Sequence, residues 1–141
     1  MTETKLKVLL IEDDETDYIG LQRAFKTLAI DCDLHLAKSG EDGWKDLVAI
    51  ASSSHKLPVV LLDINLPGQS GLETLQLIRT SPLTKDTRVI VWSNIRDQNE
   101  VDAANDLDIE GFLLKSTTGS PTLGTCYVKA ATMLNEYWRI H

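Results

Sequence analysis

Carboxylates stand at the ends of two apolar runs in this chain. Residues 59–62, Val-Val-Leu-Leu, are followed directly by Asp63, and residues 8–11 lead into Glu12 and Asp13. Carboxylates held close together repel one another, which raises the pKa of at least one of them unless a divalent cation neutralises the group. If the two runs are neighbouring strands, the three carboxylates predict an acidic pocket that suits a hard cation such as Mg²⁺.

Two later apolar runs end in residues that can assist phosphoryl chemistry. Ser93 follows Val-Ile-Val-Trp, and Lys115 follows Gly-Phe-Leu-Leu. A carboxylate that attacks a phosphoryl group forms an acyl phosphate, and a metal ion with a cationic side chain stabilises charge on the equatorial oxygens. This chemistry makes Asp63 the candidate nucleophile, Lys115 the cation and Ser93 a hydrogen-bond donor to a phosphoryl oxygen. The backbone carbonyl of Asn65 is placed to add one more oxygen ligand to the metal.

The elements that must position these residues alternate along the chain. Strands are predicted at residues 8–11, 32–37, 59–63, 88–92 and 111–115. Helical apolar spacing follows each strand, and residues suited to begin these helices are Asp14, Ser39, Ser70, Asp97 and Ser120, with the final helix at about residues 121–140. Regular alternation with short connections favours parallel strands and right-handed crossovers, which form a doubly wound α/β three-layer sandwich. All strands then end at one edge of the sheet, where the candidate residues would meet.

Length and composition limit the classes to which the chain can belong. Its 141 residues suit one domain, residues 1–141, without a separate output domain. Hydrophobic residues make up 43% of the chain, but no apolar run is long enough to cross a membrane. A net charge of −7 with no basic block argues against direct binding of nucleic acid. The polar N-terminus lacks a secretory signal, so we expect a cytoplasmic protein, with Cys32 and Cys126 as reduced structural thiols.

Four motifs, in order along the chain, resemble those of the receiver domains of two-component response regulators. They are Leu-Ile-Glu-Asp-Asp at the first strand, Leu-Leu-Asp-Ile-Asn-Leu-Pro-Gly-x-x-Gly at the third, Ser93 after the fourth and Lys115 after the fifth. The resemblance covers essentially the whole chain and implies a flavodoxin-like (CheY-like) (βα)5 fold with the sheet order 2-1-3-4-5. It also implies that Asp63 accepts a phosphoryl group from the phosphohistidine of a sensor histidine kinase, with Mg²⁺ bound.

The resemblance further implies a switch that acts through protein contacts. Phe112 matches the aromatic position on the fifth strand that packs inward when the hydroxyl residue, here Ser93, moves toward the phosphoryl group. The surface from the fourth strand to the final helix would then change shape and act on a downstream protein target. We therefore expect a signalling switch that catalyses its own phosphorylation and dephosphorylation, rather than a metabolic enzyme.

A subgroup of small response regulators paired with phytochromes is similar to this chain in its C-terminal part. Ser116 follows Lys115, whereas most receivers have a proline there, preceded by a cis peptide that orients the lysine. The final helix carries Asn-Glu-Tyr-Trp at 135–138, and Met133, Tyr137 and Ile140 widen its apolar face beyond what one contact with a sheet requires. These features predict a phytochrome-like kinase as partner. They also predict a homodimer through the final helix or through the surface from the fourth strand to that helix.

Two other classes of protein remain open. A Mg²⁺-dependent phosphatase or phosphotransferase with an aspartyl nucleophile would carry a general-acid Asp two residues after Asp63. Asn65 stands there instead, and an amide cannot exchange a proton at neutral pH. A pseudo-receiver would bind partners without being phosphorylated, which the complete set of acids and Lys115 argues against. Taken singly, Asp63 could be a helix cap, Lys115 a surface residue and Phe112 core packing.

Overall fold

Five parallel strands form one sheet in the part of the chain that the computed structural model describes, residues 5–53, 56–95, 97–115 and 124–140. The strands are β1 (Leu6–Ile11), β2 (Cys32–Ala37), β3 (Val59–Asp63), β4 (Val89–Ser93) and β5 (Gly111–Leu114). The helices are α1 (Glu15–Thr27), α2 (Gly40–Ser53), α3 (Gly71–Thr80), α4 (Gln98–Asn105) and α5 (Gly124–Arg139). Parallel pairing in the order β2-β1-β3-β4-β5 confirms the predicted sandwich and its strand order.

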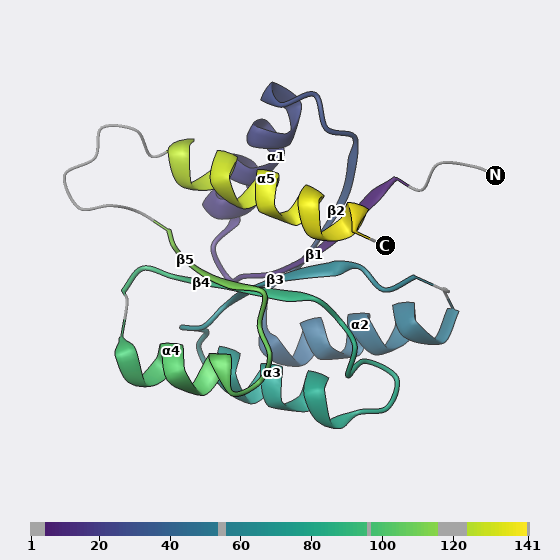
Figure 1. Cartoon of the computed structure of the whole chain (residues 1–141), viewed down its shortest axis with the longest axis vertical. Coiled ribbons are helices and arrows are strands. Elements are labelled where there is room, and N and C mark those ends of the chain that lie inside the picture. Colours follow the sequence, from purple (N-terminus) through teal and green to yellow (C-terminus); the bar gives the residue numbers. More distant parts are fainter. Residues whose placement is uncertain (1–4, 54–55, 96, 116–123, 141) are drawn as a thin grey trace.

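Helices cover both faces of the sheet. The α1 and α5 helices lie on one face, and α2, α3 and α4 lie on the other (Figure 1). Every residue of β3 and β4 is therefore buried, as expected for central parallel strands. The edge strand β2 instead alternates between half-buried and exposed residues along most of its length. The chain passes from β1 outward to β2 and then back across to β3, so the switch point where ligands bind in such folds lies between the ends of β1 and β3.

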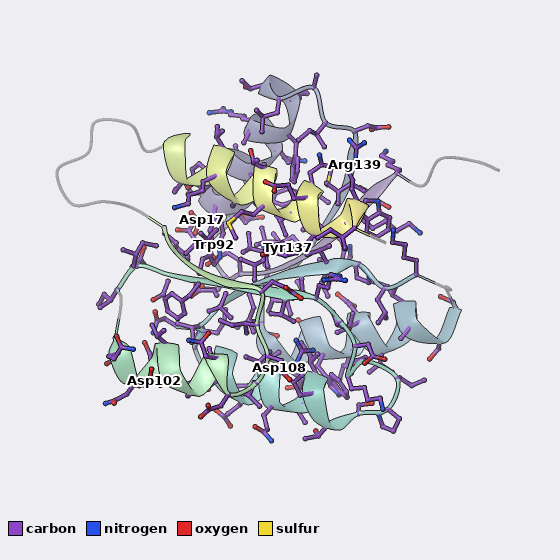
Figure 2. All side chains as sticks on the ribbon, in the orientation of Figure 1. Asp17, Trp92, Asp102, Asp108, Tyr137 and Arg139 are labelled. Carbon is purple, nitrogen blue, oxygen red and sulfur yellow. The ribbon has the colours of Figure 1, made fainter. Side chains whose placement is uncertain are left out.

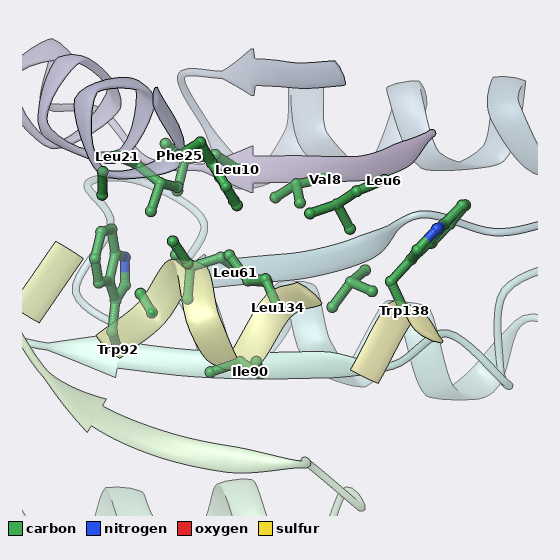
Figure 3. Close-up of a cluster of buried hydrophobic side chains, with 14 of the residues drawn as sticks. Leu6, Val8, Leu10, Leu21, Phe25, Leu61, Ile90, Trp92, Leu134 and Trp138 are labelled. Atoms are coloured by element: carbon green, nitrogen blue, oxygen red, sulfur yellow. The ribbon is translucent and has the colours of Figure 1, made fainter. Parts of the chain in front are cut away.

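Two apolar clusters hold the three layers together. The first lies between the sheet and the α1–α5 layer and includes Leu21, Leu61, Trp92 and Leu134 (Figure 3). The second lies on the opposite face, against α2, α3 and α4. Successive strand residues point to opposite faces, so the neighbours Leu61 and Leu62 enter different clusters. Trp92 is fully buried one residue before β4 ends, which puts its ring beside the edge of the sheet where the candidate residues gather.

Among the described residues, side-chain caps begin four of the helices at the residues that the sequence indicated, and at the start of α2 Ser39 accepts a hydrogen bond from the N–H of Asp42. Asp14 accepts a hydrogen bond from the N–H of Thr16 at the start of α1. Ser70 and Glu73 form a reciprocal capping box at the start of α3. Asp97 accepts hydrogen bonds from two N–H groups in the first turn of α4. These caps satisfy donors that the first helical turn leaves unpaired, and they fix the point at which each loop turns into its helix.

A few boundaries differ slightly from the prediction. The β4 strand begins and ends one residue later, so Ser93 is its last residue rather than the first residue after it. The β5 strand ends one residue earlier, so Lys115 follows the strand. The predicted start of the final helix at Ser120 lies outside the described residues. Within the described residues, no helix is both long and apolar enough to cross a membrane.

Candidate functional site

Three carboxylates meet where β1 and β3 end. The two strands are neighbours, with Ile11 opposite Leu62, so the residues that follow lie at the same edge of the sheet. One ligand oxygen from each of Glu12, Asp13 and Asp63 lies within 4.8 Å of the other two. Glu12 and Asp63 are buried, whereas Asp13 is exposed. The structure thus contains the predicted acidic pocket, at the switch point of the sheet.

The ammonium group of Lys115 lies among these carboxylates. Two strands separate the end of β5 from β1, and the long side chain reaches across the end of β4, where Nζ lies 5.5 Å from the centre of the Trp92 ring. Nζ donates a hydrogen bond to Asp63 Oδ2 at 2.8 Å and forms an ion pair with Glu12 Oε1 at 2.7 Å. A further carboxylate oxygen, Asp17 Oδ2, lies 3.0 Å from Nζ. With 7% of its surface exposed, Lys115 is a buried cation that faces three carboxyl groups.

Burial and charge pairing oppose each other in this cluster. Burial is the largest cause that raises the pKa of Glu12, to about 9, while Lys115 works against the rise and Asp63 adds to it. For Lys115, burial disfavours the charge, but its hydrogen bonds and charge interactions with Asp63 and Glu12 outweigh that effect and raise its pKa. Lys115 is therefore a permanent cation at neutral pH, and Glu12 holds a proton until a further cation neutralises the pocket.

The donor set fits a hard divalent cation. Carboxylate oxygens are the ligands that Mg²⁺ prefers, and the exposure of Asp13 gives water access to the remaining positions around such an ion. Glu12 Oε1 supports this fit. This buried oxygen pairs with Lys115, and among the described residues it has no further hydrogen-bond partner. The residues that would hold the ion are Glu12, Asp13 and Asp63, and we keep the backbone carbonyl of Asn65 as a further predicted ligand.

Asn65 and Ser93 are joined at the edge of the pocket. The N–H of Asn65 donates to Asp63 Oδ1 at 2.8 Å, which holds the loop after β3 close to the carboxylate. The Ser93 hydroxyl donates to Asn65 Oδ1 at 2.5 Å and accepts a hydrogen bond from the N–H of Ile95 at 3.2 Å. The sequence suggested only a backbone role for Asn65, so its side-chain bond to Ser93 is an addition. In this structure the Ser93 hydroxyl, which we expect to donate to a phosphoryl oxygen, donates to Asn65 instead.

Phe112 lies on β5, opposite Val91 of β4 in the strand register. Its side chain is half-buried and packs against the cluster between the sheet and α2, α3 and α4. The switching role of Phe112, in which the ring packs more deeply, stays a prediction. Ser116, whose place after Lys115 the sequence analysis singled out, lies outside the described residues.

Asp17 is a candidate residue that the sequence analysis missed. It lies on the buried side of α1, is 8% exposed, and its Oδ1 accepts a hydrogen bond from the Tyr127 hydroxyl of α5 at 2.6 Å. Its other oxygen is the one that faces Lys115. The sequence did contain a signal, because Asp17 precedes Leu21 by four residues and Ala24 by seven, and so shares the helical face of these core residues. A carboxylate on an apolar stripe needs a buried partner.

Comparison with known proteins identifies the family. Residues 8–122 match the family described as Response regulator receiver domain, and the chain belongs to it. The resemblance inferred from the four motifs is thereby confirmed. Response regulator Rcp1 from Synechocystis sp. is 31% identical over 117 residues, which cover 77% of this chain and 76% of that protein. Receiver domains are signalling switches rather than classical enzymes, in agreement with the expectation from sequence.

Two solved structures of related proteins share the fold. The crystal structure of the Mn(2+)-bound form of response regulator Rcp1 has a TM-score of 0.75 at 26% identity and covers 94% of both chains. The crystal structure of the phosphorylated cyanobacterial phytochrome response regulator RcpA has a TM-score of 0.78 at 22% identity, covering 96% of this chain and 94% of that one. The second likeness is a likeness of fold alone. The first agrees with an acidic site that suits a divalent cation.

Proposed function

We propose that this receiver domain accepts a phosphoryl group on Asp63 from the phosphohistidine of a sensor histidine kinase. The observation that carries the proposal is the environment of Asp63, which is buried, adjoins Glu12 and Asp13, and accepts a hydrogen bond from Lys115. A carboxylate in this position lies next to groups that can neutralise the anionic oxygens of an incoming phosphoryl group. Membership of the receiver family supports the same role.

The chemistry of the transfer follows from these groups. An oxygen of Asp63 attacks the phosphorus atom, the phosphorus–nitrogen bond of the phosphohistidine breaks, and the imidazole of the kinase leaves with the bonding electrons. Lys115 pairs with the phosphoryl oxygens, which stay anionic throughout the transfer, while the leaving imidazole nitrogen takes up a proton and the Asp63 carboxylate loses its charge as it becomes the acyl phosphate. Mg²⁺ supplies further positive charge beside those oxygens when bound, and its proposed ligands are Glu12, Asp13, Asp63 and the backbone carbonyl of Asn65.

The switch that follows phosphorylation begins with Ser93. Its hydroxyl exchanges Asn65 for a phosphoryl oxygen, and the end of β4 moves with it. Phe112 on the neighbouring strand β5 then packs inward. The surface made by β4, α4, β5 and α5 changes as a result and acts on a downstream protein target. Leu114 of β5 and Val128 of α5, which are 41% and 36% exposed, offer apolar contacts on these elements.

The identity of the partners is also a proposal. A phytochrome-like histidine kinase is supported by the likeness to Rcp1 and by the description of RcpA as a phytochrome response regulator. A homodimer through α5 or through the β4–α5 surface is supported by Ile140, which is 61% exposed, and by the partial exposure of Met133 and Tyr137. Light scattering at several concentrations, with and without Mg²⁺ and beryllofluoride, measures the assembly. A constant monomer mass in both states would contradict the dimer.

The intact mass of the protein tests the central proposal. After incubation with acetyl phosphate and Mg²⁺, we expect one added phosphoryl group, which EDTA and the Asp63→Asn variant both abolish. Asp14→Asn is the matched control, because Asp14 is an exposed carboxylate next to the pocket that caps α1 instead of contacting Lys115. This control variant should be phosphorylated like the wild type. Phosphorylation that persists in Asp63→Asn would show that another residue is the acceptor.

Assays on the same wild-type protein distinguish the two alternative functions, a phosphatase and a pseudo-receiver. Steady turnover of a phosphomonoester such as p-nitrophenyl phosphate would support a phosphatase. A wild-type protein that neither binds Mg²⁺ nor gains a phosphoryl group would support a pseudo-receiver. The single domain at residues 1–141 and the cytoplasmic location remain predictions from the sequence.

A further inference from the structure

A buried chain of polar contacts leads from the acidic pocket to α5. Lys115 Nζ lies 3.0 Å from Asp17 Oδ2, and Asp17 Oδ1 accepts the Tyr127 hydroxyl hydrogen at 2.6 Å. Each oxygen of this one carboxylate thus serves a different partner. The contacts join the residue after β5, the α1 helix and the α5 helix. Figure 2 shows Asp17 of α1 and Trp92 of β4 where the α1–α5 layer meets the sheet.

The packing around Tyr127 fits this arrangement closely. A Cβ atom at Gly20 would clash with the Tyr127 ring, so any larger residue at this position of α1 would displace the ring. The ring also meets Trp92 edge to face, with 6.1 Å between centroids and 71° between planes. Gly20 follows Asp17 by three residues, which puts the space for the ring and the acceptor for its hydroxyl on one face of α1.

We propose that Asp17 is a positioning residue for Lys115, and that the Lys115–Asp17–Tyr127 chain couples the phosphoacceptor site to α5. This inference rests on the function proposed above for Asp63. The two other carboxylates that pair with Lys115, Glu12 and Asp63, are both proposed to turn toward a metal ion or a phosphoryl group. Neither role is proposed for Asp17. Its carboxylate therefore stays paired with the Lys115 ammonium in every state of the site.

By pairing with Lys115, Asp17 limits the competition between this ammonium group and a metal ion for Glu12 and Asp63. Without it, the ammonium would be held only by Glu12 and Asp63, and would compete more strongly with Mg²⁺ for those two carboxylates. Asp17→Asn should therefore weaken Mg²⁺ binding. Since the variant also removes a negative charge, Asp14→Asn serves as the charge control, because it removes a carboxylate near the pocket that does not contact Lys115.

The contacts between Lys115, Asp17 and Tyr127 should also transmit the effect of phosphorylation to α5. A phosphoryl group on Asp63 adds three strong acceptor oxygens, and the ammonium of Lys115 shifts toward them. This shift draws the paired Asp17 carboxylate along with the ammonium and lengthens the bond between Asp17 and Tyr127. The contact between α1 and α5 then loosens. Coupling of this kind is reciprocal, so a change at Tyr127 must alter ligand affinity at the pocket.

Two measurements on the full chain test the inference. Intrinsic tryptophan fluorescence gives the dissociation constant of Mg²⁺, and hydrogen–deuterium exchange of the peptides covering residues 124–134 gives the response of α5 to Mg²⁺ with beryllofluoride. The variants are Asp17→Asn and Tyr127→Phe. Tyr137→Phe is the matched control, because it removes another hydroxyl of α5, one that donates to the carbonyl of Glu110.

We expect Asp17→Asn to raise the Mg²⁺ dissociation constant at least about fivefold more than Asp14→Asn does. We expect beryllofluoride to speed exchange in the α5 peptides of the wild type and of Tyr137→Phe, and to leave it unchanged in Asp17→Asn and Tyr127→Phe. The Asp17→Asn/Tyr127→Phe double variant should add little to Asp17→Asn alone, as residues of one chain of contacts are not additive. Thermal unfolding followed by circular dichroism confirms that each variant is folded.

Equal Mg²⁺ binding by Asp17→Asn and Asp14→Asn would overturn the positioning role. A normal exchange response in Tyr127→Phe would overturn the coupling to α5. Failure of the phosphoacceptor function is seen separately, as a wild type that binds Mg²⁺ but gains no phosphoryl group from acetyl phosphate. In that case the Mg²⁺ comparison still decides the role of Asp17, because it requires no phosphoryl transfer.

Discussion

The Ser93 hydroxyl donates to Asn65 Oδ1, and this bond ties the end of β4 to the loop after β3. The loop is itself held to the pocket by the bond from the Asn65 N–H to Asp63. If Ser93 is to donate to a phosphoryl oxygen, its bond to Asn65 must break first. The side chain of Asn65 would therefore compete with a phosphoryl oxygen for the Ser93 hydroxyl and oppose the proposed phosphorylated state.

Replacement of Asn65 by alanine removes this competitor and keeps the backbone carbonyl. A net hydrogen bond contributes about 0.5–1.5 kcal/mol, so we expect beryllofluoride to bind about 2- to 10-fold more tightly at fixed Mg²⁺ concentration. Fluorescence titration provides the affinity. Ser93→Ala is the partner variant and should weaken binding, because it removes the donor itself. Weaker binding by Asn65→Ala would instead mean that the amide contributes directly to the ligand site.

The raised pKa of Glu12 predicts a pH-dependent affinity for Mg²⁺. A proton and the metal ion compete for this carboxylate, so affinity should rise from pH 6 to about pH 9, where Glu12 loses its proton, by at most about tenfold per pH unit. The folded chain binds this proton more tightly than the unfolded chain does. Without metal, the contribution of Glu12 to the free energy of unfolding should therefore fall as the pH rises from 6 to about 9.

Calorimetric titration with Mg²⁺ at several pH values measures this dependence. Glu12→Gln is the control variant, since an amide has no proton to lose in this range. We expect its Mg²⁺ affinity to be weaker and nearly constant with pH. If the wild type showed an equally flat profile, Glu12 would be ionised before the metal binds, and burial would have less effect on it than we infer.

Much of the fold followed from sequence, because the period of apolar residues and the capping residues are local properties of the chain. The strand ends identified Glu12, Asp13, Asp63 and Lys115, since parallel strands must deliver their last residues to one edge. The sheet order came from family resemblance, because alternation alone does not define which strands are neighbours. Strand ends shifted by a residue, as at Ser93, because backbone pairing extends as far as the neighbouring strand permits.

The side-chain contacts of the site were less accessible to prediction. The bond between Ser93 and Asn65 depends on how two loops approach each other, and the contacts of Asp17 depend on how α1 docks against α5. Neither distance is encoded in local spacing. The position of Asp17 on a core stripe was a usable signal, but its two partners are 98 and 110 residues away in the chain.

Cys32 offers a test of burial at the edge of the sheet. Burial is the largest cause that raises the pKa of this thiol, to about 12, and Asp33 adds to the rise. Because the thiolate is the reactive form, alkylation by iodoacetamide at pH 8 should be roughly three orders of magnitude slower than for an unperturbed thiol. Mass spectrometry of a Cys126→Ala variant isolates the reaction. The same variant in urea is the control, and a rate in buffer equal to that in urea would contradict the burial.

Arg79 at the end of α3 joins two loops through backbone carbonyls. Its Nε donates to the carbonyl of Leu107 at 2.6 Å, and Nη2 donates to that of Asp108 at 2.9 Å, both after α4. Nη1 donates to the carbonyls of Lys85 and Thr87, at 3.0 and 2.8 Å, before β4. The rigid fork of a guanidinium group can reach these acceptors together, whereas an ammonium group cannot.

Replacement of Arg79 should therefore destabilise the fold. Hydrogen bonds from a charged group contribute about 1.5–3 kcal/mol, so we expect Arg79→Met to lower the free energy of unfolding by about 2–3 kcal/mol in urea denaturation at unchanged m-value. Arg79→Lys keeps the charge and should recover only part of the loss. Because the carbonyls belong to the loops that lead into β4 and β5, the unfolding of these two strands should accelerate most in native-state hydrogen exchange. Full recovery by lysine would mean that charge, rather than the fork of donors, holds the loops together.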